Sequence, residues 1–368
     1  MEQVKISTIQ LYVLMVFFQL GSAVVVGLGL QAKQGSWIAI LLGMVAGMVL
    51  FWMYTRIHLY DPENTYMDML QMAFGKVVGK AVGFIYIIYF TYLAARILRD
   101  FGELLLSATL VETPLFVILT IMILASFYVI SKGIEVLART SEFYFPILTG
   151  LVFLGIALLF ASKAVDLKKL QPYLGDGWGV ILKTAFPMTM TFPFGELVAF
   201  LMLFRYVNKT KKIRPTGYFA ILTSGVMLAF TAMMDIAVLG AETAARTTFP
   251  LLMTISHIQI GQFIQRLDAI GVFILIIGMF FKVSIFYYVA VSCTASVFNV
   301  DKFKQLFYPI SLVILFGALT ITSNFSEHLE EGMILVPFFL HLPLQLGVPF
   351  LVLAILAVRY RKEFNAVK

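Results

Sequence analysis

The stretch Thr191-Phe192-Pro193-Phe194-Gly195-Glu196 decides the fold. It interrupts an apolar run between positions 179 and 204, and a helix needs about 20 such residues to cross a bilayer. A proline followed by a glycine and a carboxylate at this depth leaves backbone groups without helical hydrogen bonds. Such groups are tolerated in a membrane only where protein or a water-filled cavity surrounds them. The stretch therefore predicts a functional break in a membrane-spanning helix.

The composition of the whole chain supports a membrane location. Of its 368 residues, 61% are hydrophobic and 13% are charged, whereas soluble chains carry about 45–50% apolar and about 25% charged residues. A soluble chain of this length has too little interior for so much apolar surface. These figures exclude a cytosolic enzyme, a secreted disulfide scaffold and a disordered tail. The net charge of +7 is attributed to cytoplasmic loops, and no nucleic-acid binding is expected.

The residue types that build metal and catalytic sites are scarce in this chain. Cys293 is the single cysteine, which excludes an intramolecular disulfide and a cysteine-cluster metal site. The four histidines are scattered at loops and span ends, without metal-ligand spacing and without a nucleophile beside a base; they are His58, His257, His328 and His341. We interpret them as interfacial residues and expect neither a metal, nor a cofactor, nor enzymatic activity.

Ten apolar windows are long enough to span the bilayer. They are continuous, without the alternation of barrel strands, and therefore predict helices. The windows are 8–30, 36–55, 79–109, 113–131, 142–162, 179–204, 215–241, 267–296, 305–323 and 334–358. The expected fold is thus an all-α polytopic membrane protein, with residues 1–368 forming one transmembrane domain.

The loops between the windows indicate how the chain is oriented. Most of the 27 Lys and Arg residues fall on the side that holds both termini, so both termini are predicted to be cytoplasmic. Residues 64–74 show helical spacing of apolar residues and predict an amphipathic helix on the inner face. The apolar stretch 249–264 predicts a short helix on the outer face.

The exceptional residues divide the chain into two matching halves. Gly21-Ser22-Ala23 interrupts the first window as the proline and glycine interrupt the sixth, and intramembrane charges occur in the third and the eighth. Five spans per half require the second half to enter the membrane from the opposite side. The pattern therefore predicts an inverted repeat of about 8–162 and about 179–358, with a ligand site between the broken helices 1 and 6. Close helix packing is an alternative explanation for the small residues at 21–23.

The intramembrane charges need partners, because a charge near the bilayer centre costs about 2.5–3.5 kcal/mol on insertion scales. In the third window, Arg96 and Asp100 stand four residues apart and are expected to pair, as are Arg99 and Glu103. Lys282 stands alone in the eighth window. Its expected partner is Glu196, and carbonyls freed by the break in the first span are the alternative. Such an ammonium group would replace a bound sodium ion or carry a proton.

At the family level, the chain resembles the amino acid–polyamine–organocation transporter superfamily, which has a LeuT-like fold. It is most similar to the B subunits of GerA-type spore germinant receptors. The matching motifs are Gly133-Ile134-Glu135-Val136-Leu137-Ala138-Arg139, Thr191-Phe192-Pro193-Phe194-Gly195-Glu196, Thr248-Phe249-Pro250, Arg266-Leu267-Asp268-Ala269 and Phe281-Lys282. The resemblance covers nearly the whole chain.

The resemblance implies a site and a function. Backbone N–H groups of Gly21, Ser22 and Ala23 would bind the carboxylate of an amino acid. The segment Thr191, Phe192, Pro193, Phe194 and Gly195 would hold its amino group and side chain. Tyr89 or Tyr92 would act as a lid, and Arg96 with Glu196 would set the polarity of the outer approach.

On this resemblance the protein is a nutrient sensor of the spore inner membrane, with a partner A subunit and a lipoprotein C subunit. The alternative function is a proton-coupled amino acid transporter of the same fold.

Overall fold

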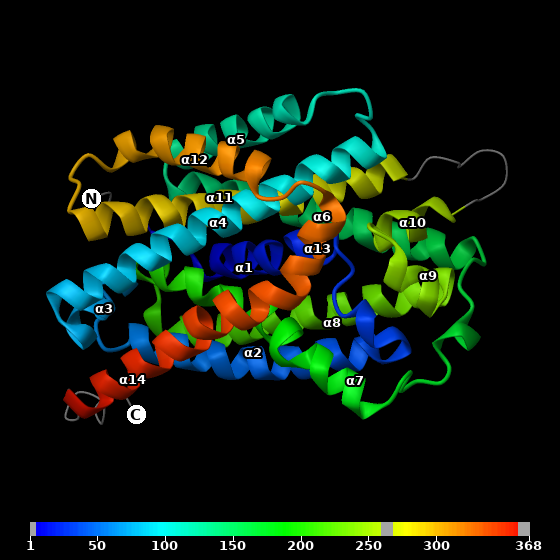
Figure 1. The fold of residues 1–368 in the computed structure, drawn as a ribbon, viewed down its shortest axis with the longest axis horizontal. Helices are drawn as coiled ribbons and strands as arrows, with labels where there is room; N and C mark the ends of the chain where they lie inside the picture. The colour runs from blue at the N-terminus through cyan, green and yellow to red at the C-terminus, as the bar shows by residue number, and fades with distance from the viewer. Residues whose placement is uncertain (1–4, 259–267, 360–368) are drawn as a thin grey trace.

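The computed structural model describes residues 5–258 and 268–359, and in these ranges it contains helices and connecting loops but no strand longer than an isolated bridge between Ile6 and Val207. The helices form a bundle along one common direction (Figure 1). Their bounds are α1 (Thr8–Ala23), α2 (Ser36–His58), α3 (Tyr66–Phe74), α4 (Lys76–Ala108), α5 (Leu115–Ser131), α6 (Ile134–Ala161), α7 (Trp178–Lys183), α8 (Ile213–Leu239), α9 (Ala241–Arg246), α10 (Pro250–Ser256), α11 (Asp268–Phe298), α12 (Phe307–Thr320), α13 (Phe325–Glu330) and α14 (Val348–Arg359).

The membrane-spanning helices follow the apolar windows of the sequence. Among the described residues, eight helical stretches are long and apolar enough to cross a bilayer, and two shorter apolar helices, α1 and α5, coincide with the first and fourth windows. The protein is therefore a multi-pass membrane protein, and ten spans remain the prediction. Helix α6 exposes most of its surface, as expected for a helix that faces lipid.

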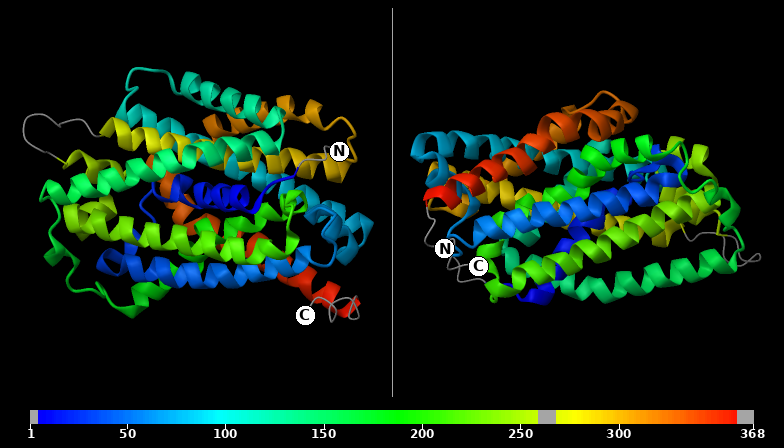
Figure 2. Two further views of the ribbon diagram at one scale, coloured as in Figure 1. Left: turned by 180° about the vertical axis from the view of Figure 1, so that it is seen from behind. Right: turned by 90° about the horizontal axis from the view of Figure 1, so that it is seen from below.

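Helix α1 lies inside the bundle, where it packs against α6, α8 and α11 (Figure 2). Ser7 begins the helix with a capping box, because its side chain accepts a hydrogen bond from the Gln10 amide while the Gln10 side chain binds the Ser7 amide. Close approach to α11 depends on two glycines. A Cβ atom at Gly21 would lie 2.9 Å from the carbonyl oxygen of Gly278.

The first predicted span is wrong at its C-terminal end. Helix α1 stops at Ala23 rather than continuing to position 30, and Gly21 and Ser22 are still helical. The chain then turns through Gly27 and Gly29, whose φ angles of 65° and 75° favour glycine. A short 3₁₀ helix, Leu30–Gly35, leads into α2. The interruption of the first span therefore follows Gly21-Ser22-Ala23 instead of containing it.

The sixth span is broken as expected. After α7, the segment Thr184–Phe194 has non-helical backbone at Phe186 and Phe192, and a 3₁₀ helix, Gly195–Met202, follows. We call Thr184–Phe194 the broken segment. It packs against α2, where a Cβ atom at Gly43 would lie 2.2 Å from Thr189 Oγ1. The prolines at 187 and 193 lack the amide hydrogen that a regular helix requires.

The tenth predicted span, 334–358, is not a regular helix throughout. Before α14, residues Pro337–Gly347 form a wide π-helical segment that contains Pro343. We call Pro337–Gly347 the wide segment. A proline removes a backbone donor and crowds the preceding turn, so the carbonyl groups of that turn are free to accept other hydrogen bonds.

Two short helices are found within the segments in which the sequence predicts them. Residues Tyr66–Phe74 form α3, which a Thr65–Asp68 capping box begins, and its apolar face packs on α4 and α14. The predicted outer helix 249–264 is observed as α10 over Pro250–Ser256. Residues 259–267, which include Arg266 and Leu267, lie outside the described residues.

Candidate functional site

A buried ion pair joins the broken sixth span to α11. The distance between Lys282 Nζ and Glu196 Oε2 is 2.6 Å, and the two side chains are 0% and 2% exposed. Lys282 also donates a hydrogen bond to Ser22 Oγ at 3.0 Å and lies 4.5 Å from the centre of the Phe192 ring. One ammonium group thus links the first, sixth and eighth spans. The contact to the first span is a hydroxyl group rather than the backbone carbonyls considered as the alternative.

A small cavity of about 50 Å³ lies beside this ion pair. Its lining is apolar with a few polar groups, a composition typical of small-molecule sites. The lining residues are Ser22, Val26, Leu28, Leu93, Arg96, Ile97, Asp100, Met188, Phe192, Glu196, Leu329, Gly332, Met333, Val336 and His341. A single water needs about 10–15 Å³ on this measure, so the cavity has room for a few waters. A larger ligand requires the walls to move apart.

Five of the side chains predicted to form the site line this cavity: Ser22, Phe192, Arg96, Asp100 and Glu196. Lys282 lies directly behind them through its contacts with Ser22 and Glu196. These six residues come from four different spans, and only the tertiary structure brings them together.

The other predicted ligand-binding residues lie around the cavity without lining it. Gly21 packs against α11, as the packing alternative proposed, and Ala23 is buried. Thr191 donates to the carbonyl of Pro187 at 2.9 Å. Pro193 and Phe194 are buried, and a Cβ atom at Gly195 would lie 2.2 Å from the Gln345 amide oxygen.

Most backbone amides after α1 are already used within the chain. The amides of Val24, Val25, Val26 and Leu28 all bind carbonyls between Leu20 and Ala23. The C-terminus of a helix presents carbonyl oxygens, which carry partial negative charge and favour a cation. This end of the site is therefore better suited to an ammonium group than to a carboxylate in the conformation observed.

The charges on α4 pair differently from the prediction. Arg99 and Glu103 form the expected ion pair at 2.8 Å, but Arg96 and Asp100 form none. Asp100 Oδ1 lies 2.9 Å from His328 Nε2, and Arg96 donates to the His328 carbonyl at 2.5 Å and to the Tyr92 hydroxyl at 3.2 Å. His328, in helix α13, therefore binds both Arg96 and Asp100 in place of the predicted pairing. The sequence does not show that α13 packs against α4.

The interpretation of the histidines as interfacial residues is wrong for three of them. His58, His328 and His341 are at most 4% exposed, and His257 alone is exposed. His328 binds Asp100, and His341 Nδ1 lies 2.7 Å from the Tyr89 hydroxyl. Tyr89, predicted as a lid, is thus engaged with the tenth span.

The wide segment of the tenth span contributes polar groups that the sequence interpretation missed. Gln345 donates to the Tyr89 hydroxyl at 2.8 Å. The Tyr86 and Tyr54 hydroxyls donate to the carbonyls of Leu344 and Gln345 at 2.5 and 2.7 Å. The sequence signal was present: Pro337 and Pro343 interrupt an apolar window in which two polar side chains stand four residues apart.

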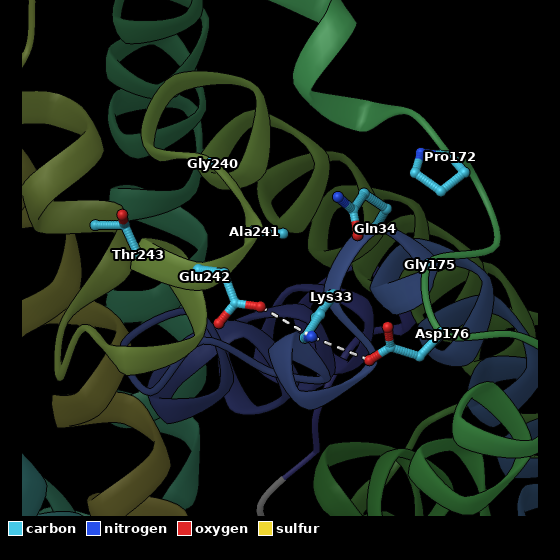
Figure 3. A pocket seen from close by; sticks show the side chains of 9 residues that line it. All are labelled: Lys33, Gln34, Pro172, Gly175, Asp176, Gly240, Ala241, Glu242 and Thr243. Atoms are coloured by element: carbon cyan, nitrogen blue, oxygen red, sulfur yellow. Dashed lines mark ion pairs between the residues drawn. The ribbon is translucent and has the colours of Figure 1, made fainter.

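A second, open pocket of about 400 Å³ lies between the segment after α1, the loop before α7 and the start of α9 (Figure 3). Lys33 Nζ lies 2.9 Å from Glu242 and 3.1 Å from Asp176, so it connects the loop after α1 with the loop before α7 and with α9. Hydrogen bonding from Lys33 holds the pKa of the Glu242 carboxyl below its ordinary value. Among the described residues, no cluster of His, Cys, Asp and Glu has the geometry to hold a metal ion.

These features define a class of membrane protein: a transporter-like bundle whose broken helices surround a buried ion pair. A solved structure of MhsT in complex with L-phenylalanine superimposes with a TM-score of 0.66 at 13% identity, covering 100% of this chain and 99% of that one. The likeness shows a LeuT-like fold.

Comparison of sequences gives the family. The family model described as spore germination protein matches residues 5–326. Spore germination protein KB of Bacillus subtilis (strain 168) is 40% identical over 99% of this chain and 97% of its own length. Spore germination protein YndE of the same organism is 25% identical over 87% of this chain and 88% of its own length. The chain belongs to the spore germination protein family, which confirms the resemblance to B subunits of germinant receptors.

Proposed function

We propose that this protein is the germinant-sensing membrane subunit of a spore germination receptor and that it binds a small amino acid near the middle of the membrane. The observation that supports this most directly is the cavity enclosed by the ends of two broken spans beside the Lys282–Glu196 pair. Broken helices at matching positions are typical of binding sites near the membrane midplane, and the paired charges make a polar site inside an apolar bundle. Family membership supplies the biological setting.

We also propose a location, a topology and partner subunits for this protein. The chain lies in the spore inner membrane with both termini in the cytoplasm, as the distribution of Lys and Arg predicts. It consists of two inverted repeats, about 8–162 and about 179–358, and signals to an A and a C subunit. Because the cavity of about 50 Å³ is too small for an amino acid, binding selects a wider conformation, and the partner subunits respond to that change in population.

Ligand occupancy of the cavity is tested with a cysteine at Val26, which lines it. Cys293 is buried and is the chain's single native cysteine, so the background is silent. The Val26→Cys variant should react with a membrane-impermeant maleimide whenever the protein visits the wider conformation. The compounds to test are the twenty L-amino acids, with neutral hexoses as a comparison class. We expect the germinant among them to slow labelling at least about tenfold at saturation. Labelling that no compound slows would contradict ligand binding at this cavity.

A proton-coupled amino acid transporter is the second candidate function, and the buried Lys282–Glu196 pair is the observation in its favour, since such a pair is suited to carry a proton. Uptake of labelled amino acids into proteoliposomes separates the two candidates. We expect no saturable uptake by the protein. Saturable uptake that is lost in Lys282→Ala would establish transport.

A further inference from the structure

The tenth span places a histidine at the cavity without a protein partner for one of its ring nitrogens. His341 lines the cavity and is 2% exposed. Its Nδ1 lies 2.7 Å from the Tyr89 hydroxyl. Within residues 5–258 and 268–359, its Nε2 has no hydrogen-bond partner, and it is not among the polar atoms sealed from solvent. A nitrogen in this position is satisfied by whatever occupies the cavity, either water or a ligand.

The neighbouring hydrogen bonds determine which nitrogen of His341 carries the proton. Gln345 Nε2 donates to the Tyr89 hydroxyl oxygen at 2.8 Å. The hydroxyl oxygen has a second lone pair, but its hydrogen has no acceptor among the described residues other than His341 Nδ1. Donation of that hydrogen to Nδ1 satisfies both groups and makes Nδ1 the acceptor. A neutral imidazole with an unprotonated Nδ1 carries its hydrogen on Nε2. The Nε2–H group of His341 is therefore a donor available to the cavity.

The orientation of the Gln345 amide agrees with this assignment. Its oxygen lies against Gly195, so close that a Cβ atom there would be 2.2 Å away. The oxygen has no hydrogen-bond partner there, but an amide N–H₂ group in the same place would leave two donors without an acceptor, which is the costlier arrangement. The Gln345 nitrogen therefore faces Tyr89, and both side chains, 0% and 2% exposed, are held firmly by packing.

We propose that His341 is a ligand-contacting, specificity-determining residue whose Nε2–H donates a hydrogen bond to an oxygen of the ligand, a carboxylate or hydroxyl oxygen. Tyr89 and Gln345 are positioning residues that fix the imidazole. Arg96 of α4 also lines the cavity and is a second donor, so the two groups together favour the oxygen-bearing end of a ligand. This inference rests on the proposed function for the ligand's role as a germinant, but the proton position is independent of it.

The proton position is tested without any ligand. In protein labelled with ¹⁵N-histidine and reconstituted in bilayers, the His341 signals are identified by their loss in His341→Gln. We expect an unprotonated Nδ1 and a protonated Nε2 in the wild type. We expect a mixture of tautomers in Tyr89→Phe, which lacks the hydroxyl. A protonated Nδ1 in the wild type would overturn the proposal.

The contact to the ligand is tested by germination of spores that carry the intact receptor, with the twenty L-amino acids and neutral hexoses as probes. For the compound that activates the wild type, we expect His341→Leu to raise the half-maximal concentration at least about tenfold, as loss of a buried hydrogen bond implies. His341→Gln retains an N–H donor and should shift it about threefold or less. His257→Leu is the matched control at an exposed histidine and should change nothing.

The outcomes separate this inference from the proposed function. If the wild-type receptor responds to a compound and His341→Leu responds equally well at equal protein levels, the His341 contact is wrong and the sensing function stands. If the wild type responds to none of the probes, the proposed amino acid sensor fails, while the tautomer measurement still decides the proton position. A response to a hexose alone would keep the His341 contact and replace the ligand class.

Discussion

Replacing Lys282 by methionine is expected to lower the free energy of unfolding by about 3–5 kcal/mol, because the substitution leaves the Glu196 carboxylate buried without its cation. The two side chains are 0% and 2% exposed and 2.6 Å apart, so bulk water does not reach the carboxylate, and the few waters that the cavity can hold do not replace a cation. The substitution also removes the hydrogen bond that the ammonium group donates to the Ser22 hydroxyl. The measurement is thermal or denaturant-induced unfolding of the purified protein in detergent.

Two further variants make this prediction specific to the pair. The double variant Lys282→Met with Glu196→Gln removes both charges, and we expect it to recover a large part of the lost stability. Lys209→Met removes an exposed lysine from a loop and should leave the unfolding transition unchanged within about 0.5 kcal/mol. A double variant as unstable as Lys282→Met would show that packing of the lysine stem, not its charge, is what stabilises the fold.

Gly43→Ala adds only one methyl group, yet we expect it to lower the free energy of unfolding by about 1–3 kcal/mol. Overpacking of a well-packed interior typically costs this much. The new Cβ atom would lie 2.2 Å from Thr189 Oγ1, 2.7 Å from the Thr189 carbonyl carbon and 2.9 Å from the Met190 amide nitrogen. Two of these atoms are backbone, so a change of rotamer does not relieve the contact. Helix α2 and the broken segment must separate instead, which should also disturb the cavity wall at Met188 and Phe192.

Gly150→Ala is the matched control for this substitution. Gly150 also stands inside a long helix, α6, but a Cβ atom there meets nothing within 4 Å. Because alanine is the better helix former, we expect unchanged stability or a gain of up to about 1 kcal/mol. If both substitutions lowered the free energy of unfolding equally, the close contact between α2 and the broken segment would not exist in the membrane.

Much of the fold was predictable because membrane insertion obeys a simple rule of length and apolarity. The break in the sixth span was predictable for the same reason, since proline, glycine and a carboxylate stand out against an apolar run. The partnership of Lys282 and Glu196 also followed from the sequence, as two charges too deep for solvent have few partners to choose from.

Errors arose where a partner came from a distant part of the chain. The Arg96–Asp100 pair was inferred from helical spacing alone, yet α13 brings His328 to both residues and separates them. The tenth span carries no charge in its apolar window, so the sequence analysis assigned no site residue to it. Its wide segment instead receives hydrogen bonds from Tyr54 and Tyr86, and its Gln345 side chain donates one to Tyr89.

The sequence by itself determined that this chain crosses the membrane many times, that its sixth span is interrupted, and which charges must be buried. These properties depend on local composition, because each residue's transfer into the bilayer has a free energy of its own. Only the tertiary structure decided where α1 ends, which histidines face the site and how small the closed cavity is. Those properties depend on contacts between elements far apart in the chain, and their free energy exists only once the helices have packed.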